Sequence, residues 1–169
     1  MDRERGNLIY GEIQYQGLIV ISNEIRKTAE LRKSIFTEIG SGFGKGCRVI
    51  AELNSIYCNA VELDSDKHEI AKKISYSNQL QLIKYINEDI RKIPKILNKS
   101  DYVYCNNWTY HKNLNRFIWE NLKKGCEYFV FKIDDLEDVL TNDQKNSINK
   151  FGVKVSWLVN GIQCYKLIK

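Results

Sequence analysis

The hydrophobic positions of the chain change period several times, from alternation to a spacing of three and four residues and back. Short apolar runs predict strands over residues 34–39, 57–63, 80–86, 102–105 and 128–133. Stripes at helical spacing predict a helix that begins in the glycine-rich segment 40–46, and further helices over residues 66–77, 90–97 and 114–122. Strands that alternate with helices of this length favour right-handed crossovers and a mostly parallel sheet with helices on both faces.

The same spacing predicts which side chains of the helices face the sheet. The expected inward positions are Gly46, Val49, Ile50 and Leu53 in the first helix and Ile70, Ala71 and Ile74 in the second. The two histidines, His68 and His111, are expected at solvent-facing helix starts among charged neighbours, where neither is a persuasive catalytic base. The run 144–150 is polar and predicts a surface helix or loop.

The C-terminal pattern differs from the rest. Val153, Val155 and Trp157 alternate with polar residues, and apolar positions resume at Ile162 after the pair Asn160-Gly161. Asn-Gly between such runs predicts a tight type I′ hairpin, because both central residues of that turn need a positive φ. A doubly wound, mostly parallel α/β sheet that ends in an antiparallel hairpin is typical of the Rossmann-like class I S-adenosylmethionine-dependent methyltransferase fold.

Composition adds limits to this picture. A chain of 169 residues with 43% hydrophobic content can bury one core, so we expect a single domain over residues 1–169. The net charge of +5 is a mild excess that favours an acidic partner without identifying one. Five widely spaced cysteines indicate reduced, buried thiols rather than disulfides or a zinc site. With a polar N-terminus and no apolar run near 18 residues, we expect an intracellular protein without a membrane span, cytoplasmic or nuclear.

The stretch FTEIGSGFGKG, residues 36–46, carries the first chemical signal. Gly40, Gly42 and Gly44 allow a sharp turn and a close approach of the backbone to a ligand after the first strand. A dinucleotide is one candidate, but Lys45 stands where G-x-G-x-x-G needs its last glycine, and Glu38 would repel a pyrophosphate. A carboxylate at Glu38 suits a cationic amine, such as the α-amino group of S-adenosylmethionine.

Acidic residues end the next two strands as well. Glu62 is placed to accept hydrogen bonds from two ribose hydroxyls. Asp89 could accept from an adenine amino group, with Ile90 packed on the ring. The order of the three acids along successive strand ends favours an S-adenosylmethionine site over three unrelated solvated carboxylates.

Four segments together resemble the non-SET histone-lysine methyltransferases named for disruption of telomeric silencing. YCNNWTY is similar to the N-N-F-x-F segment of that family, with Trp108 and Tyr110 in place of its two phenylalanines. IYGEIQY is similar to its Y-G-E loop, EIGSGFG to its D-L-G-S-G-x-G, and VSW to its C-terminal strand. The resemblance runs over residues 9–167, with an N-terminal loop and helix in residues 1–33 and the Rossmann-like core in residues 34–169.

The resemblance implies S-adenosylmethionine as cofactor and a protein lysine as methyl acceptor. It implies that Tyr10 closes over the methionine part of the cofactor and that Asn106 lies where methyl donor and amine meet. The expected cofactor-binding residues are Tyr10, Glu12, Glu38, Gly40, Ser41, Gly42, Gly44, Glu62, Asp89, Ile90 and Asn106. The expected catalytic residues are Asn106, Tyr10, Trp108 and Tyr110.

The chemistry is compatible with these residues. Methyl transfer from a sulfonium is an in-line displacement that depends on alignment and needs no metal. Aromatic walls formed by Tyr10, Trp108 and Tyr110 would desolvate a lysine ammonium, favour the neutral amine and tolerate a methylammonium product. The expected partner is a histone or another chromatin-associated protein, with weak nucleic-acid contact and no membrane.

Two alternatives stay open. Asn106 followed by aromatic residues also resembles the N/D-P-P-[FY] site that methylates exocyclic amines of adenine, although this chain lacks the prolines that would fix the backbone there. The other alternative is a module that binds S-adenosylmethionine without catalysis.

Overall fold

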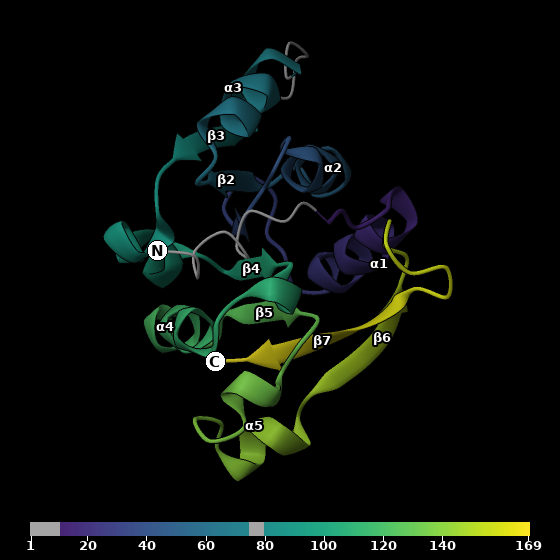
Figure 1. Cartoon of the computed structure of the whole chain (residues 1–169), viewed down its shortest axis with the longest axis vertical. Coiled ribbons are helices and arrows are strands. Elements are labelled where there is room, and N and C mark those ends of the chain that lie inside the picture. The colour runs from purple at the N-terminus through teal and green to yellow at the C-terminus, as the bar shows by residue number, and fades with distance from the viewer. Residues whose placement is uncertain (1–10, 75–79) are drawn as a thin grey trace.

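The computed structural model describes residues 11–74 and 80–169, and within them seven strands form one sheet in the order β3-β2-β1-β4-β5-β7-β6 (Figure 1). The strands are β1 (Ile35–Ile39), β2 (Tyr57–Glu62), β3 (Ile83–Asn87), β4 (Tyr102–Cys105), β5 (Glu127–Val130), β6 (Asn149–Val153) and β7 (Ile162–Ile168). The α-helices are α1 (Tyr15–Arg26), α2 (Lys45–Asn54), α3 (Ser65–Ile74), α4 (Lys112–Asn121) and α5 (Asn142–Asn146). Short 3-10 turns are η2 (Leu80–Leu82), η3 (Ile90–Lys92), η4 (Pro94–Lys99), η5 (Asn107–Thr109) and η6 (Asp134–Leu136).

The strand order confirms the predicted doubly wound sheet. Strands β1 to β5 pair in parallel, and β7 pairs antiparallel with both β5 and β6. The chain runs outward from β1 to β3 and then crosses back to β4, which lies on the other side of β1. The carboxyl ends of β1 and β4 therefore meet at a topological switch point, where open α/β sheets bind their ligands.

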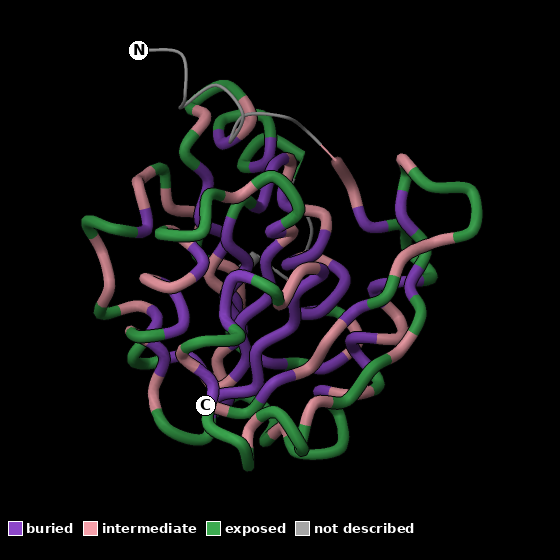
Figure 2. Tube along the Cα trace, turned by 60° about the horizontal axis from the view of Figure 1, so that its bottom comes forward, coloured by how far each residue is buried: buried purple, intermediate pink, exposed green. Residues whose placement is uncertain are grey.

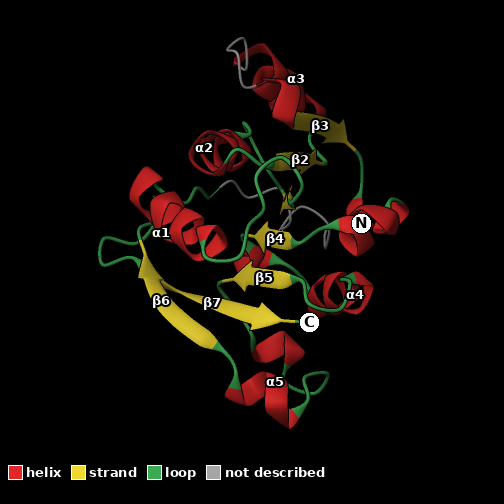
Figure 3. Ribbon diagram, turned by 180° about the vertical axis from the view of Figure 1, so that it is seen from behind, coloured by secondary structure: helices red, strands yellow, loops and turns green. Residues whose placement is uncertain are grey.

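Helices cover both faces of the sheet, as Figures 1 and 3 show from opposite sides. On one face, α1 and α2 pack through Leu18, Ile21 and Ile50 against strand residues such as Phe36. On the other face, α4 packs through Ile118 and Trp119. Buried residues run through the centre of the molecule with exposed ones at the rim (Figure 2). The five cysteines are all unbridged and buried, as predicted.

Helix α3 differs from its prediction in the side chains that it buries. Ala71 is buried as expected, but Ile70 and Ile74 are 42% and 56% exposed, and His68 is buried instead of facing solvent. The reason is that α3 packs over the edge of the sheet, on β2 and β3, so only a narrow stripe of the helix is covered. The predicted C-terminal turn of this helix, residues 75–77, lies outside the described residues.

The C-terminal hairpin is present, but its turn is not the predicted one. Strand β6 ends at Val153, which pairs with Ile162, so residues 154–161 form a longer connection. Gly161 has a positive φ of 75°, whereas Asn160 does not, which excludes a type I′ turn. The alternation at Val155 has another cause, because this residue forms an isolated antiparallel bridge with Ile13.

Smaller differences concern length. The segment predicted as a helix over residues 90–97 forms the two turns η3 and η4, and β5 ends at Val130, three residues earlier than expected. The polar run 144–150 is shared between α5 and the start of β6 and is mostly exposed, as predicted. No helix in the described part of the chain is long and apolar enough to cross a membrane.

Candidate active site

The glycine-rich loop joins β1 to α2 at the switch point. Gly40, Gly42 and Gly44 have φ values of 70°, 53° and 72°, a region that side chains rarely adopt. The backbone N–H groups of Gly40 and Ser41 donate to the Val61 carbonyl at 2.9 and 3.0 Å, which ties the loop to the end of β2. The loop is thus a rigid backbone surface that a ligand can approach closely.

Glu38 lies beneath this loop, and α2 begins against its carboxylate. Oε2 accepts a hydrogen bond from the backbone N–H of Cys47 at 2.9 Å. A Cβ at Gly46 would lie 2.2 Å from Oε1, so only glycine lets the helix come this close. Burial raises the pKa of Glu38 to about 7, against the lowering effect of the Cys47 hydrogen bonds and Arg48.

Glu62 holds the loop from the end of β2. Its Oε2 accepts from the N–H of Gly42 at 2.6 Å, and its Oε1 accepts from the N–H of Asp64 at 2.9 Å. The side chain is 7% exposed and reaches a second hollow described below. Each oxygen keeps a further lone pair, so Glu62 can still accept hydrogen bonds from a ligand.

A small cavity, called here the inner cavity, opens between the N-terminal segment, the loop and β4. Its lining residues are Gly11, Glu12, Ile13, Glu38, Gly40, Ser41, Lys45, Gly46, Tyr104 and Asn106. Three of the polar atoms on these residues are buried and have no hydrogen-bond partner in the described part of the chain: Ser41 Oγ, the Tyr104 hydroxyl and Asn106 Oδ1. Buried polar atoms are nearly always satisfied, so this concentration indicates a polar ligand.

The orientation of the Asn106 amide follows from its hydrogen bond to Gly11. Nδ2 donates to the Gly11 carbonyl at 2.8 Å, and Oδ1 is then an acceptor with no partner among the residues that the structure describes. Glu12 from the same N-terminal segment pairs with Lys45 at 2.8 Å. Sequence reasoning missed Lys45 and Tyr104, although Tyr104 pairs in register with Glu38 across β1 and β4 and could have been found from that pairing.

A second hollow, called the outer hollow, lies beside the ends of β2 and β3. Its lining includes Gly40, Glu62, Asp89, Ile90 and Tyr110, together with Ile39, Val61, Leu63, Glu88, Arg91 and Leu114. Asp89 accepts from Arg91 through both carboxylate oxygens, with Nε at 2.9 Å from Oδ2, and this pairing lowers the pKa of Asp89. Asp89, which was expected to accept from an adenine amino group, is therefore already paired with the guanidinium group of Arg91.

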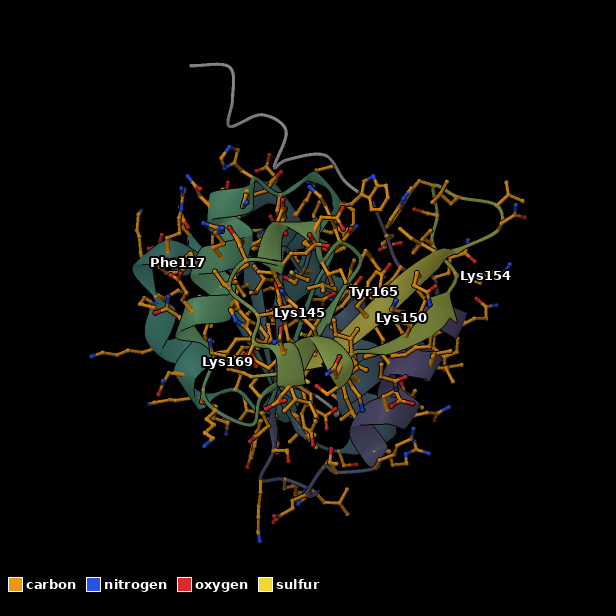
Figure 4. All side chains as sticks on the ribbon, turned by 90° about the horizontal axis from the view of Figure 1, so that it is seen from below. Phe117, Lys145, Lys150, Lys154, Tyr165 and Lys169 are labelled. Atoms are coloured by element: carbon orange, nitrogen blue, oxygen red, sulfur yellow. The ribbon has the colours of Figure 1, made fainter. Side chains whose placement is uncertain are left out.

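Of the three aromatic residues expected around the acceptor, the two that the structure describes, Trp108 and Tyr110, line different hollows. Tyr110 lines the outer hollow, and Tyr10 lies outside the described residues. Trp108 is 51% exposed and lines a third, aromatic hollow with Phe131, Lys132, Ile133, Asp134 and Tyr165. Figure 4 labels Tyr165 on β7 next to Lys150 of β6, whose Nζ lies 5.7 Å from the ring centre.

Asn107, next to Asn106, is a structural residue. Its Nδ2 donates to the Lys132 carbonyl at 2.6 Å, and its Oδ1 accepts from the N–H groups of Phe131 and Lys132, both at 3.0 Å. These bonds join the segment after β4 to the end of β5. They fix the backbone from which Asn106 reaches the inner cavity.

Residues 37–144 match the family model described as a methyltransferase domain. The chain belongs to this family. The match includes the loop, the three acidic strand ends and Asn106, and it supports S-adenosylmethionine dependence and the predicted cofactor. The methyltransferase has no significant match among curated proteins.

Solved structures share the fold of this methyltransferase at low identity. Precorrin-6y C5,15-methyltransferase from Geobacter metallireducens is 10% identical, with a TM-score of 0.66 over 90% of this chain and 87% of that one. The SAM-dependent O-methyltransferase from Thermotoga maritima is 13% identical, with a TM-score of 0.66 over 99% and 70%. The SAM-dependent methyltransferase from Thiobacillus denitrificans, in complex with S-adenosyl-L-homocysteine, is 16% identical, with a TM-score of 0.57 over 76% and 52%. These similarities confirm the fold class and give no evidence for the histone-lysine subfamily.

Proposed function

We propose that this methyltransferase transfers a methyl group to the side-chain amine of a lysine in a protein. The observation that carries the proposal is the Asn106 amide, whose nitrogen donates to Gly11 and whose buried Oδ1, beside the inner cavity, has no hydrogen-bond partner among residues 11–74 and 80–169. An amide oxygen in this position accepts an N–H from an incoming amine. The N–H bond then fixes the direction of the nitrogen lone pair, and such alignment supplies much of the rate of a displacement.

The two cavities fit the two ends of S-adenosylmethionine, which supplies a sulfonium-bound methyl group when bound. Glu38 is suited to the α-ammonium group in the inner cavity, where Lys45 and the hydroxyls of Ser41 and Tyr104 offer donors for a carboxylate. Glu62 is suited to ribose hydroxyls in the outer hollow, and Ile90 offers an apolar surface there. Gly40 lines both cavities and lies where the cofactor would pass between them.

The acceptor must reach Asn106 as a neutral amine. A free lysine has a pKa of about 10.4, and desolvation in a narrow apolar entrance lowers it. Trp108 follows Asn106 by two residues and exposes about half of its surface, so its ring is available to contact an incoming side chain. Aromatic faces attract ammonium groups by about 0.5–2 kcal/mol.

The second candidate is transfer to an exocyclic amine of a nucleic-acid base. It needs the same acceptor atom, Asn106 Oδ1, and an exposed aromatic ring such as that of Trp108 could stack on a base. The residue after Asn106 differs from the N/D-P-P-[FY] motif and therefore argues against this candidate. Asn107 stands where that motif has a proline, so no proline makes the backbone rigid there, and its amide forms hydrogen bonds with the backbone of Phe131 and Lys132.

The partner that we propose is a chromatin-associated or other nucleic-acid-associated protein. The support is the net charge of +5, which suits an acidic assembly. Binding to DNA that contacts several phosphates should weaken steeply between about 50 and 200 mM salt. DNA binding that is absent, or insensitive to salt, would favour a free protein as substrate.

The acceptor is tested by incubating the protein with isotopically labelled S-adenosylmethionine and a mixture of histones, lysate proteins, DNA and RNA, followed by mass spectrometry. We expect label on lysine, lost in Asn106→Ala but kept in Asn121→Ala, whose side chain donates to the Phe117 carbonyl on α4, away from both cavities. S-adenosylhomocysteine should still bind to Asn106→Ala. Label on adenine, or on other protein residues, would contradict the lysine assignment, and binding without any label would leave a cofactor-binding module.

A further inference from the structure

Tyr110 lies on the path that joins the two cofactor cavities. Its hydroxyl donates to the Ile39 carbonyl at 3.2 Å, at the last residue of β1. A Cβ built on Gly40 would lie 2.5 Å from the same hydroxyl. The phenol oxygen therefore occupies the space directly over Gly40.

Gly40 is the residue that the inner cavity and the outer hollow have in common. A ligand that places an amino-acid end near Glu38 and a nucleoside near Glu62 has to cross the backbone at this point. The absence of a side chain at Gly40 suits such a close passage. The ligand and the Tyr110 hydroxyl then compete for the space that a Cβ of Gly40 would occupy, because the hydroxyl already fills it.

We infer that Tyr110 is a gate of the cofactor site, which closes the passage over Gly40 in the free protein and turns away when S-adenosylmethionine binds. This role differs from the acceptor channel predicted for Tyr110. The inference rests on the cofactor part of the proposed function and is independent of the acceptor.

The backbone on both sides of Tyr110 is anchored by contacts that do not involve its side chain, whose half-buried ring packs against the hydrophobic core. Asn107 is anchored to the end of β5 by three hydrogen bonds, and His111 caps α4 by accepting from the N–H of Asn113. Tyr110 itself lies between these anchors with extended backbone angles, φ −71° and ψ 141°. Its hydroxyl has one hydrogen bond, to Ile39, among the described residues. Burial raises the pKa of Tyr110 well above its usual value, so the phenol stays a neutral donor.

A closed gate lowers the apparent affinity for the cofactor by the fraction of molecules that are open. Tyr110→Phe keeps the ring but removes both the hydrogen bond to Ile39 and the atom over Gly40. We expect the dissociation constant of S-adenosylhomocysteine, measured by calorimetry, to fall about 2- to 10-fold, which is the range for loss of one neutral hydrogen bond from the closed state. The association rate, measured by stopped flow, should rise in proportion.

Tyr102→Phe is the matched control, because it removes a hydroxyl bonded to Thr28 at the opposite end of β4 and should leave the dissociation constant unchanged. An unchanged or higher dissociation constant in Tyr110→Phe would overturn the gate, whatever the acceptor proves to be. If neither the wild type nor the variant binds S-adenosylhomocysteine, the gate and the cofactor assignment fail together. A lysine assignment that fails while Tyr110→Phe binds more tightly leaves the gate in place.

Discussion

Among single residues, two glutamates of the site, Glu38 and Glu62, lie in different surroundings. Glu38 is enclosed by the start of α2, where the missing side chain of Gly46 leaves room for its carboxylate. Burial raises the pKa of Glu38 to about 7. Glu62 instead accepts two backbone N–H groups, which shape the loop that it holds. The first carboxylate is the one that we propose as the partner of a cationic group, and the second both holds the loop and faces the outer hollow.

Replacing Glu62 tests the nucleoside end of the site. Glu62→Ala should weaken S-adenosylhomocysteine binding by about 1–3 kcal/mol, because charge-assisted hydrogen bonds to the ribose and the support of the loop are lost. Calorimetry measures the change, and Glu69→Ala on the exposed side of α3 serves as the control. Equal affinities of Glu62→Ala and wild type would show that this carboxylate does not contact the ligand.

Glu38 makes stability depend on pH. The pKa of Glu38 is about 7 in the folded protein, compared with an ordinary value of 4.5 for an exposed glutamate. The protonated side chain therefore contributes its full stabilisation below about pH 4.5, and this stabilisation is lost as the pH rises through about 7. Relative to Glu38→Gln, the free energy of unfolding should fall by about 3 kcal/mol between pH 4.5 and 8. Urea denaturation of both proteins across this range measures it, and parallel pH profiles would refute the assignment.

The same group links cofactor binding to protons. A ligand ammonium near Glu38 favours the ionised carboxylate, so S-adenosylhomocysteine should bind more tightly at pH 7.5 than at pH 6, with release of a proton. Calorimetry in buffers of different ionisation enthalpy detects that proton. Glu38→Gln should show neither effect, and a wild-type affinity that does not change with pH would argue against an ammonium at this position.

At the scale of elements, the glycine loop and α2 act as one unit. The helix starts one residue after Gly44, and its second residue, Gly46, lies against Glu38. Alanine favours a helix over glycine by about 0.5–1 kcal/mol, yet here its Cβ would overlap the carboxylate. We expect the steric overlap with Glu38 to destabilise the protein by more than the higher helix propensity of alanine stabilises it.

Gly46→Ala should therefore destabilise the protein by about 1–3 kcal/mol, the usual cost of overpacking, and weaken S-adenosylhomocysteine binding. Gly152→Ala in β6 is the control, because a Cβ there meets nothing within 4 Å. Thermal and urea unfolding give the stability difference. A Gly46→Ala variant at least as stable as wild type would mean that the contact with Glu38 relaxes freely.

Element by element, the sequence predicted what local patterns determine. The parallel strands up to β4, the start of α2 in the glycine loop and the order of Glu38, Glu62 and Asp89 follow from hydrophobic period and strand ends. Features set by distant neighbours were not predictable: Val155 alternates because it bridges Ile13, and His68 is buried because α3 sits over a sheet edge. Tyr110 was expected beside Asn106 because YCNNWTY resembles the N-N-F-x-F segment, but the two residues line different cavities, on either side of η5.

At the scale of the whole molecule, segments distant in sequence close the inner cavity together. The N-terminal segment contributes Gly11 and Glu12, the start of α2 contributes Lys45, and β4 leads into Asn106. The connection after β6 holds the N-terminal segment in place, with Ser156 donating to the Glu12 carbonyl at 2.8 Å and Gln14 to the Lys154 carbonyl at 2.8 Å. The cavity thus depends on nearly the full length of the described chain.

Binding of S-adenosylmethionine across Gly40 is tested by calorimetric titration of the wild type with S-adenosylhomocysteine and, separately, with NAD. We predict saturable, one-to-one binding of S-adenosylhomocysteine, with no comparable heat from NAD because Glu38 repels a pyrophosphate. Tight binding of NAD with no response to S-adenosylhomocysteine would instead identify a dinucleotide site.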